Sequence, residues 1–262
     1  MIRALSNAAS GMKAQELNID ILSNNLANVN TAGYKRARAE FADLFYEAKR
    51  RPGAPSPDGT PIPVGLEIGH GVRPVATHKN FSGGEMRETG NPLDISIEGR
   101  GFFQVSQPDG TYAFTRAGVL KTNSEGQVVN ADGYALDPEL SIPEDATSIS
   151  VSENGVVSVT LGGDNQQVEV GQIQIATFPN PAGLSSAGRN LYTETPASGR
   201  AVLGTAGEEG SGRLLQGFVE SSNVAVVGEM IDLIAAQRAY EINSKVIQAA
   251  DHMLQQTTRL GR

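Results

Sequence analysis

The sequence predicts an α+β protein whose two ends form long, paired, coiled-coil-like helices and whose middle forms a mainly antiparallel β domain. Near both termini, apolar residues recur at alternating spacings of three and four, the period of a helix with a narrow apolar seam. Between the termini the hydrophobic period changes to two. Gly and Pro are also frequent, with 30 and 13 residues, which is typical of strands joined by tight turns.

The first helix is expected to fill most of residues 1–34. Its seam is formed by Leu5, Ala8, Met12, Gln15, Ile19, Leu22, Leu26 and Val29. The sequence Asn30-Thr31-Ala32-Gly33 then predicts the end of the helix, because glycine suits the left-handed position that follows a helix terminus.

The last helix is expected within residues 221–262, with Asn223 as its N-cap and Gly261 as its end. Its seam is formed by Ala235, Ala239, Ile242, Val246, Ala249, Met253, Gln256 and Leu260. A neighbouring line widens this stripe and contains Tyr240, Asn243, Ile247, Ala250 and Leu254. The two helices together form a discontinuous terminal domain, 1–34 and 221–262. They should pack against each other or against copies of themselves, and we expect them to be loosely ordered in a free monomer.

Residues 35–74 and 196–220 are expected to form an extended linker region around the β domain. Residues 34–45 mix apolar and polar positions and are interpreted as extended. The segment 46–65 holds Pro52, Pro55, Pro57, Pro61 and Pro63, which excludes a helix. Such a segment favours a stiff extended or polyproline course, and a flexible linker remains an equal alternative.

The β domain is expected over residues 75–195. Alternating strands are predicted at 95–97, 102–105, 112–115, 149–151, 157–159, 168–170 and 173–175. Asp109-Gly110 predicts a hairpin, and Asp132-Gly133 and Asn154-Gly155 mark further turns. Residues 196–213 are rich in Gly, Ala, Ser and Glu and predict an irregular return loop.

Composition excludes several classes of function. The net charge is −8 and the acidic residues concentrate in the middle of the chain, which argues against binding to nucleic acid. The chain has no Cys, so it has neither disulfides nor thiolate metal sites. No apolar run predicts a cleaved signal or a membrane span.

No constellation in the sequence predicts an enzyme, a metal site or a cofactor. The three histidines, His70, His78 and His252, are not spaced as metal ligands. Paired acids such as Glu208/Glu209 lie in predicted loops. The run Gly207–Gly212 lacks the lysine and the preceding strand of a phosphate-binding loop.

Three separated groups of motifs resemble the axial proteins of the bacterial flagellum, the rod and hook family. The first is Leu22–Arg36 (LSNNLANVNTAGYKR), which includes Asn24, Asn25, Ala27, Asn28, Gly33 and Tyr34. The middle motifs are Thr89–Asp94 (TGNPLD), Gly99–Phe103 (GRGFF) and Tyr112–Gly118 (YAFTRAG). The last are Ser222–Val224, Glu229–Ile231 and Gln237–Lys245, which include Gln237, Arg238, Tyr240, Glu241 and Asn243.

The resemblance spans the chain and implies a structural subunit of the rod. Such a protein is exported unfolded, without a cleaved signal, by the flagellar type III export apparatus. It polymerises with itself into a hollow, straight drive shaft that crosses the periplasm and transmits torque from motor to hook. The implied partners are its own copies, proximal rod proteins, the hook protein and the ring proteins of the cell wall and outer membrane. Nucleic acid and membrane insertion are not implied.

The extra segment after the first helix favours the distal part of the rod. The resemblance implies that this segment, with Tyr46, Arg51, the five prolines and Gly65, contacts neighbouring subunits and keeps the tube straight. The competing hypotheses are a proximal rod or hook-type axial subunit and, in a different class, a β-domain binding module with a helical dimerisation stalk. The absence of Trp weakens a sugar-binding module.

Overall fold

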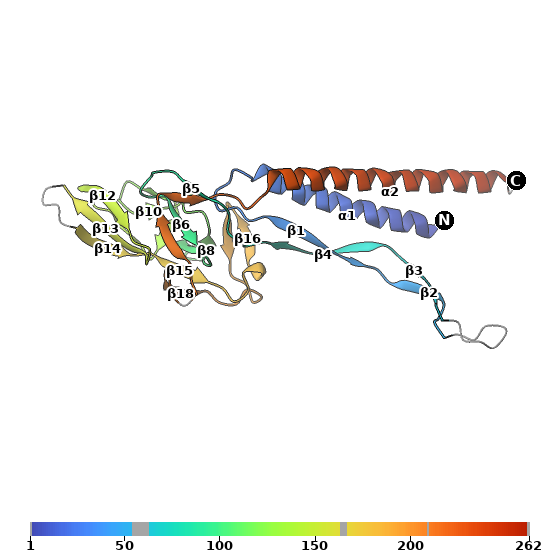
Figure 1. Cartoon of the computed structure of the whole chain (residues 1–262), viewed down its shortest axis with the longest axis horizontal. Helices are drawn as coiled ribbons and strands as arrows, with labels where there is room; N and C mark the ends of the chain where they lie inside the picture. Colours follow the sequence, from blue (N-terminus) through green and yellow to red (C-terminus); the bar gives the residue numbers. More distant parts are fainter. Residues whose placement is uncertain (1, 54–62, 163–166, 209, 261–262) are drawn as a thin grey trace. The chain divides into compact units, whose positions relative to one another are not determined.

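The computed structural model describes residues 2–53, 63–162, 167–208 and 210–260. The chain forms two compact units. The helical unit consists of Met1–Leu26, Ala37–His78 and Val226–Arg262, and the β unit consists of Ala27–Arg36 and Lys79–Ala225. The architecture is α+β with a helix at each end and a mainly antiparallel β domain, as the sequence predicts (Figure 1).

The helical unit contains α1 (Ile2–Ala27) and α2 (Val226–Leu260), which run antiparallel and side by side (Figure 1). Near one end, Asn25 Nδ2 donates a hydrogen bond of 3.1 Å to Glu229 Oε2. Four turns away along both helices, a Cβ placed on Gly11 would lie 3.0 Å from Asn243 Nδ2. From the first contact to the second, the residue number falls along α1 and rises along α2. The two contacts therefore fix the antiparallel register of the helices.

The described residues of Ala37–His78, in the helical unit, form a two-stranded ribbon. Its strands are β1 (Ala37–Asp43), β2 (Tyr46–Arg50), β3 (Leu66–Gly69) and β4 (Val72–Lys79), and β1 pairs with β4 while β2 pairs antiparallel with β3. Asn7 Nδ2 donates 3.1 Å to Gly69 O, and Val72 N donates 3.3 Å to Ser10 Oγ. These bonds hold the ribbon against α1. Part of the expected linker 35–74 is therefore paired β structure, because backbone pairing satisfies groups that an isolated linker leaves to water.

The β unit is built from short strands. The described residues form a seven-stranded sheet in the order β16-β17-β8-β7-β11-β10-β9, and a three-stranded sheet in the order β12-β13-β14. The first sheet consists of Ser185–Gly188, Leu191–Thr193, Tyr112–Thr115, Phe103–Ser106, Ala135–Asp137, Val128–Val129 and Lys121–Thr122 in that order. The second consists of Ala146–Val151, Val156–Leu161 and Gln167–Gln172.

Among the described residues, three two-stranded sheets complete the β unit. They pair β15 (Gln174–Thr177) with β18 (Val202–Thr205), β19 (Arg213–Gln216) with β6 (Ile95–Glu98), and β20 (Phe218–Glu220) with β5 (Met86–Glu88). A short 3-10 helix, Pro181–Gly183, precedes β16. The expected irregular loop at 196–213 thus contains β18 and leads directly into β19. The part of this segment that pairs is Val202–Thr205, which lies opposite β15.

The predicted turns join antiparallel neighbours. Asp109-Gly110 connects β7 to β8, where Val105 pairs with Ala113, and Asn154-Gly155 connects β12 to β13. Gly110 and Gly155 have φ values of +80° and +87°, in the left-handed region that favours glycine. The hairpin prediction is confirmed.

Two cores lie inside the β unit. The larger one combines residues from most of its strands, including Ile97, Phe103, Val159 and Ile175, which are fully buried. The smaller one is aromatic and contains Phe102, Phe114, Phe178 and Tyr192, with Phe81 packed against it. The rings meet edge to face, with Phe102 and Phe178 at a centroid distance of 5.6 Å.

The predicted end of the first helix and the predicted start of the last helix differ from the structure. Helix α2 begins at Val226 rather than after Asn223. The Asn223 side chain instead accepts a hydrogen bond of 2.8 Å from Arg36 N and donates to Asn80 O at 2.9 Å. Helix α1 ends at Ala27, and Gly33 N donates 2.8 Å to Glu220 O, far along the chain. In both places long-range partners replace the local caps.

Candidate functional site

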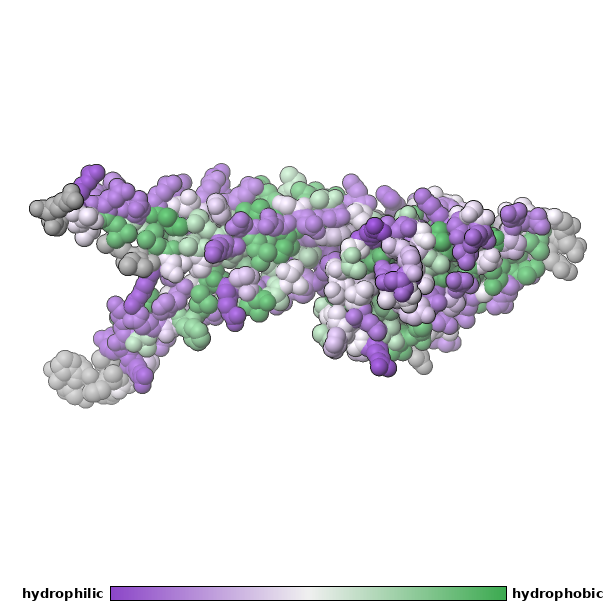
Figure 2. All heavy atoms as spheres, turned by 180° about the vertical axis from the view of Figure 1, so that it is seen from behind, coloured by the Kyte–Doolittle hydropathy of each residue, from purple (hydrophilic) through white to green (hydrophobic). Residues whose placement is uncertain are grey.

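An exposed apolar stripe follows α2, and we call it the outer stripe. Its large side chains are Val227, Ile231, Ile234, Ile242, Val246 and Met253, with exposed fractions between 41% and 72%. The exposed Ala235 and Ala249 lie along the same side. Figure 2 shows hydrophobic side chains at the surface along the helical unit. A run of exposed large apolar residues at helical spacing indicates an interaction surface.

The outer stripe includes much of the predicted seam of α2. Ala235, Ile242, Val246, Ala249 and Met253 are exposed and Ala239 is half-buried, while the side-chain surroundings of Leu260 lie outside the description. In the predicted seam of the first helix, Ala8 and Leu22 are buried. The half-buried seam residues are Leu5, Met12, Gln15, Ile19, Leu26 and, just after the end of α1, Val29.

Other residues of the same chain cover a different line of α2. Its members are Glu229, Leu233, Ala236, Asn243, Ile247, Ala250 and Leu254, all buried or half-buried. This line includes most of the neighbouring line that widens the predicted stripe. Small residues at Ala236 and Ala250, with Gly11 on α1 opposite Asn243, allow the close approach. The bulky Leu233, Ile247 and Leu254 of this line are half-buried, whereas Ile242 and Val246 of the outer stripe are exposed.

Asn25 connects three elements of the helical unit. Besides the bond to Glu229, its side chain donates 2.9 Å to Ala37 O and accepts 2.9 Å from Ala37 N. It therefore pairs with the first residue of β1 as a second strand would. Its side chain is fully buried, so its polar atoms depend on these partners.

The other motif residues have distinct environments. In α1 and the turn after it, Asn24 and Ala27 are exposed, while Asn28 O accepts a bond of 3.1 Å from Thr31 N. In α2, Gln237 is exposed, Arg238 Nη1 lies 2.9 Å from Glu241 Oε2 at the surface, and Tyr240 is 41% exposed.

The described residues of the expected rod-straightening segment, 46–53 and 63–65, lie in and after β2 and just before β3. Tyr46 opens β2 and is 57% exposed, and Arg51 and Pro52 are exposed after β2. A Cβ on Gly65 would lie 2.8 Å from both Arg50 O and Pro52 Cδ, so only glycine fits where the two sides approach. Pro63 precedes this position and is exposed. Pro55, Pro57 and Pro61 lie outside the described residues.

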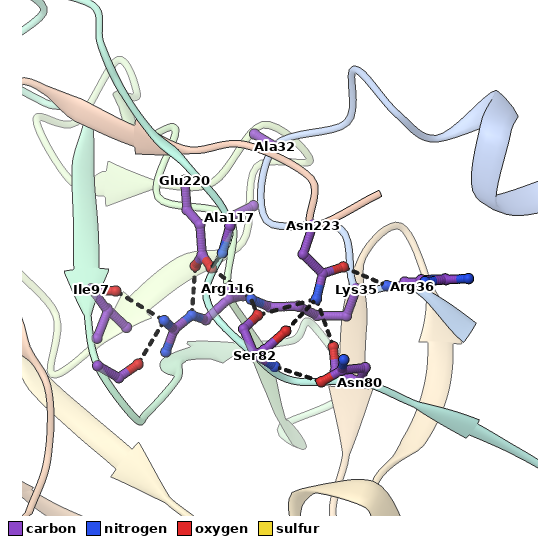
Figure 3. Close-up of polar contacts among 12 residues, drawn as sticks. Ala32, Lys35, Arg36, Asn80, Ser82, Ile97, Arg116, Ala117, Glu220 and Asn223 are labelled. Carbon is purple, nitrogen blue, oxygen red and sulfur yellow. Dashed lines mark hydrogen bonds and ion pairs between the residues drawn. The ribbon is translucent and has the colours of Figure 1, made fainter. Parts of the chain in front are cut away.

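A buried ion network organises the β unit (Figure 3). Lys35 Nζ lies 2.6 Å from Glu220 Oε1, and Arg116 Nε lies 2.6 Å from Glu220 Oε2. At most 3% of each side chain is exposed. Lys35 follows α1, Arg116 follows β8 and Glu220 ends β20. One carboxylate thus joins three distant parts of the chain.

Backbone carbonyls balance the second positive charge of the network. Arg116 donates to Gly101 O at 2.6 Å, Gly99 O at 2.7 Å and Ile97 O at 2.9 Å, and Lys35 donates to Ser82 O at 2.8 Å. Burial by itself raises the pKa of Glu220, but the charges of Arg116 and Lys35 hold it below its usual value. Burial lowers the pKa of Lys35, against the opposing effect of Glu220.

The segment Ala27–Arg36, which we call the neck, is thereby part of the β unit. Gly33 has φ +67°, and a Cβ there would lie 2.6 Å from the Arg116 carbonyl carbon. Tyr34 is buried, with Lys79 Nζ 5.7 Å from its ring centroid. Asn190 Nδ2 donates 2.8 Å to Ala32 O.

Sequence reasoning did not find this network. Lys35 and Arg116 lie inside quoted motifs and Glu220 lies just before another, so charged residues within those motifs were the available signal. Nothing local shows that the three meet, because 185 positions separate Lys35 from Glu220.

The described residues contain neither a candidate metal site nor a membrane-spanning helix. Within residues 2–53, 63–162, 167–208 and 210–260, no group of three or more His, Asp or Glu side chains is placed to hold a metal ion. In the same ranges, neither α1 nor α2 is long and apolar enough to cross a membrane.

Three sequence families match successive parts of the chain. Residues 5–35 match the family described as flagella basal body rod protein, residues 96–159 match the flagellar hook protein FlgE/F/G D1 domain, and residues 215–260 match the flagellar basal body rod FlgEFG protein C-terminal region. The three matches fall on α1 with the neck, on the β unit, and on β19 to α2.

Similar proteins cover the full length. The chain is 48% identical to flagellar basal-body rod protein FlgG of Borreliella burgdorferi over 100% of both chains. It is 49% identical to the protein of that name in Caulobacter vibrioides over 99% of both. It is 36% identical to that of Bacillus subtilis over 100% of both. The chain belongs to the flagellar basal-body rod protein FlgG family.

Proposed function

We propose that this chain is a subunit of the distal rod that polymerises through the outer stripe of α2 into a straight, hollow drive shaft. The observation that carries the proposal is the exposure of large aliphatic side chains along the predicted seam, with Ile242 60% and Ile231 61% exposed. A structural rod subunit is the function of the family.

The outer stripe is large enough to drive association. Burying its six large side chains contributes on the order of 10 kcal/mol before the entropic costs of assembly. These residues lie on one helix, so a helix from another copy covers them efficiently. We propose coiled-coil-like packing between terminal helices of neighbouring copies, which suits the alternating three-four spacing.

Assembly of this kind is open-ended because the covered and exposed faces of α2 differ. The line around Ala236 and Ala250 is occupied by the chain's own packing, whereas the outer stripe is available. We propose that a neighbour contacts the stripe with a different part of its surface, because contact between the stripes of two rotated copies would close at a dimer. Heterologous contacts that do not close produce helical filaments.

The ribbon and its proline-rich segment support a straight shaft. Two-stranded pairing in β1–β4 and the bonds from Asn7 and Ser10 fix the ribbon against α1. Prolines restrict the backbone of the segment further. We propose that residues 46–65 contact adjacent subunits and resist bending of the tube.

Rod membership implies assembly with other rod, hook and basal-body components. We propose that the direct partners are other copies, proximal rod proteins, the hook protein and the rings of the cell wall and outer membrane. We also propose export by the flagellar type III apparatus without a cleaved signal and a location crossing the periplasm. An acidic, outward β unit would turn within the rings with little adhesion, and unchanged rotation after charge reversal on that unit would count against this role.

The test of the proposal is a charge placed on the outer stripe. Ile242→Asp should abolish sedimentable polymer while leaving thermal unfolding of the β unit unchanged. Gln248→Asp is the matched control, since it adds a charge at an exposed position of the same helix outside the stripe. Normal polymer from Ile242→Asp would rule out assembly through the stripe. Growth that stops at a dimer in the wild type would favour the helical-stalk binding module.

A further inference from the structure

Three ends of the β unit lie together around the side chain of Asn223. The chain passes between its two units at four places, which follow Leu26, Arg36, His78 and Ala225. Arg36, Asn80 and Asn223 each lie at one of these passages or within two positions of it, on the side of the β unit. Figure 3 shows the Asn223 side chain pointing toward Arg36, Asn80 and Ser82. We call these four residues the exit joint.

The Asn223 side chain uses both of its polar atoms in the exit joint. Its Oδ1 accepts a hydrogen bond of 2.8 Å from Arg36 N, and its Nδ2 donates to Asn80 O at 2.9 Å and to Ser82 O at 3.1 Å. Because one partner is a backbone N–H and the others are carbonyl oxygens, the residue must accept on one side and donate on the other. An amide side chain does both, whereas a carboxylate only accepts.

Backbone bonds bring the same segments together. Asn80 N donates 2.8 Å to Arg36 O, and Asn223 N donates 3.4 Å to Tyr34 O. Lys79, the first residue of the β unit after the ribbon, places its Nζ 5.7 Å from the centroid of the Tyr34 ring. The neck is therefore attached to both of the other exit segments by more than one interaction.

We propose that Asn223 is a positioning residue that holds three exits of the β unit together, so that torque enters this unit through all three at once. The inference rests on the proposed drive shaft and assigns one joint within each subunit. Segments that are bonded side by side share a load, because their bonds must break together. Separate segments would transmit the same load through one backbone connection at a time.

The exit joint differs from a displaced helix cap. A cap satisfies amide groups in the first turn of its own helix. The Asn223 side chain bonds instead to the end of the neck and to residues 80–82, while α2 begins at Val226. Loss of a cap would loosen α2, whereas loss of the joint would separate the neck from residues 80–82.

The first experiment measures amide hydrogen exchange by NMR in the full-length monomer with Asn223→Ala. Arg36 N loses its acceptor and should exchange faster in any case. The informative amide is Asn80 N, because its acceptor is Arg36 O and not the altered side chain. We expect it to exchange about tenfold faster, the fold-change expected for the loss of one hydrogen bond. Unchanged exchange at Asn80 N would overturn the proposal.

Asn180→Ala is the matched control, since the Asn180 side chain also donates to a distant carbonyl of the β unit, Ala197 O, at 3.0 Å. It should leave the exchange of Asn80 N unchanged. The amides of β7 and β8 should keep their wild-type exchange in both variants. Faster exchange throughout β7 and β8 in Asn223→Ala would show that the residue supports the whole unit, and would overturn a local joint.

The second experiment uses Asn223→Asp, which separates the two halves of the joint. At neutral pH the carboxylate can accept from Arg36 N but cannot donate to Asn80 O or Ser82 O. Arg36 N should therefore stay protected while Asn80 N exchanges about tenfold faster. Wild-type exchange at both amides would contradict the role of the Nδ2 donor.

The third experiment tests the load on the assembled shaft. Asn223→Ala should polymerise at the wild-type rate, because the outer stripe is unaltered, but defined shear should leave fragments at least twofold shorter in electron micrographs. Asn180→Ala polymer should match the wild type. Equal fragment lengths in the two variants would overturn the sharing of load by the exits. Failure of the rod proposal is distinguishable, since it depends on Ile242→Asp and the exchange measurements need no polymer.

Discussion

Lys35 Nζ and Glu220 Oε1 lie 2.6 Å apart in the interior of the β unit, although they come from opposite ends of the chain. The pair means that the β unit is completed by the neck. Glu220 also pairs with Arg116. The buried carboxylate and the two buried cations therefore depend on one another for charge balance.

Replacing Lys35 by Met should lower the free energy of unfolding of the β unit by about 3–5 kcal/mol, because the change leaves a buried charge network without one partner. Denaturant unfolding of the full chain measures the change. Lys121→Met, at an exposed position, is the control and should stay within about 0.5 kcal/mol of the wild type. Equal stability of the two variants would contradict a structural role for the pair.

Acid should destabilise the β unit through Glu220. Its pKa is lower in the folded chain than in the unfolded chain, so the unfolded chain binds the extra proton first. The stabilisation is complete above the unfolded pKa, which is about 4.5, and is lost as the pH falls through the folded pKa. Glu220→Gln should be less stable near pH 7 and should lose this part of the acid dependence. A variant with the wild-type slope of stability against pH below about 4.5 would argue against this origin.

Gly33→Ala should destabilise the neck by more than about 1 kcal/mol, because the position has φ +67° and the new Cβ would meet the backbone of Arg116. Thermal unfolding measures the effect. Gly83→Ala provides the comparison at a position with open space. Similar melting temperatures for both variants would show that the neck can shift at no cost.

Asn25→Ala should release the joint between α1, β1 and α2 at a cost of about 1–3 kcal/mol, since it leaves buried polar partners unsatisfied. Hydrogen exchange should show faster exchange at Ala37 N, which loses its acceptor. Ser23→Ala, at an exposed position of α1, should leave that amide protected. Unchanged protection in Asn25→Ala would mean that the side-chain bonds do not hold β1.

Limited proteolysis should yield a core that retains the neck. We expect residues 79–225 to resist digestion and residues 27–36 to remain bound to them without a covalent connection, because Lys35, Tyr34 and Gly33 are buried in the β unit. Native mass spectrometry detects the complex. Recovery of the 79–225 core without the neck peptide would contradict this division of the chain.

Much of the fold could be predicted from periodicity and turn chemistry. The four-three spacing predicted α1 and α2, and the period of two with Asp109-Gly110 predicted the β7–β8 hairpin. These features depend on residues that are close in sequence. The boundaries were less predictable because Asn223 and Gly33 bond to distant backbone groups in place of the helix ends.

The sequence by itself determined that α2 carries a wide apolar stripe, since helical geometry places residues three and four apart on one side. Only the tertiary structure decided which line of that stripe α1 covers, because Ala236, Asn243 and Ala250 permit an approach that Ile242 and Val246 do not. It also decided that Lys35, Arg116 and Glu220 meet. The spacing of residues along the chain contains no information about such contacts. They form where the fold buries the three charged groups together, because a buried charge is costly unless it is paired.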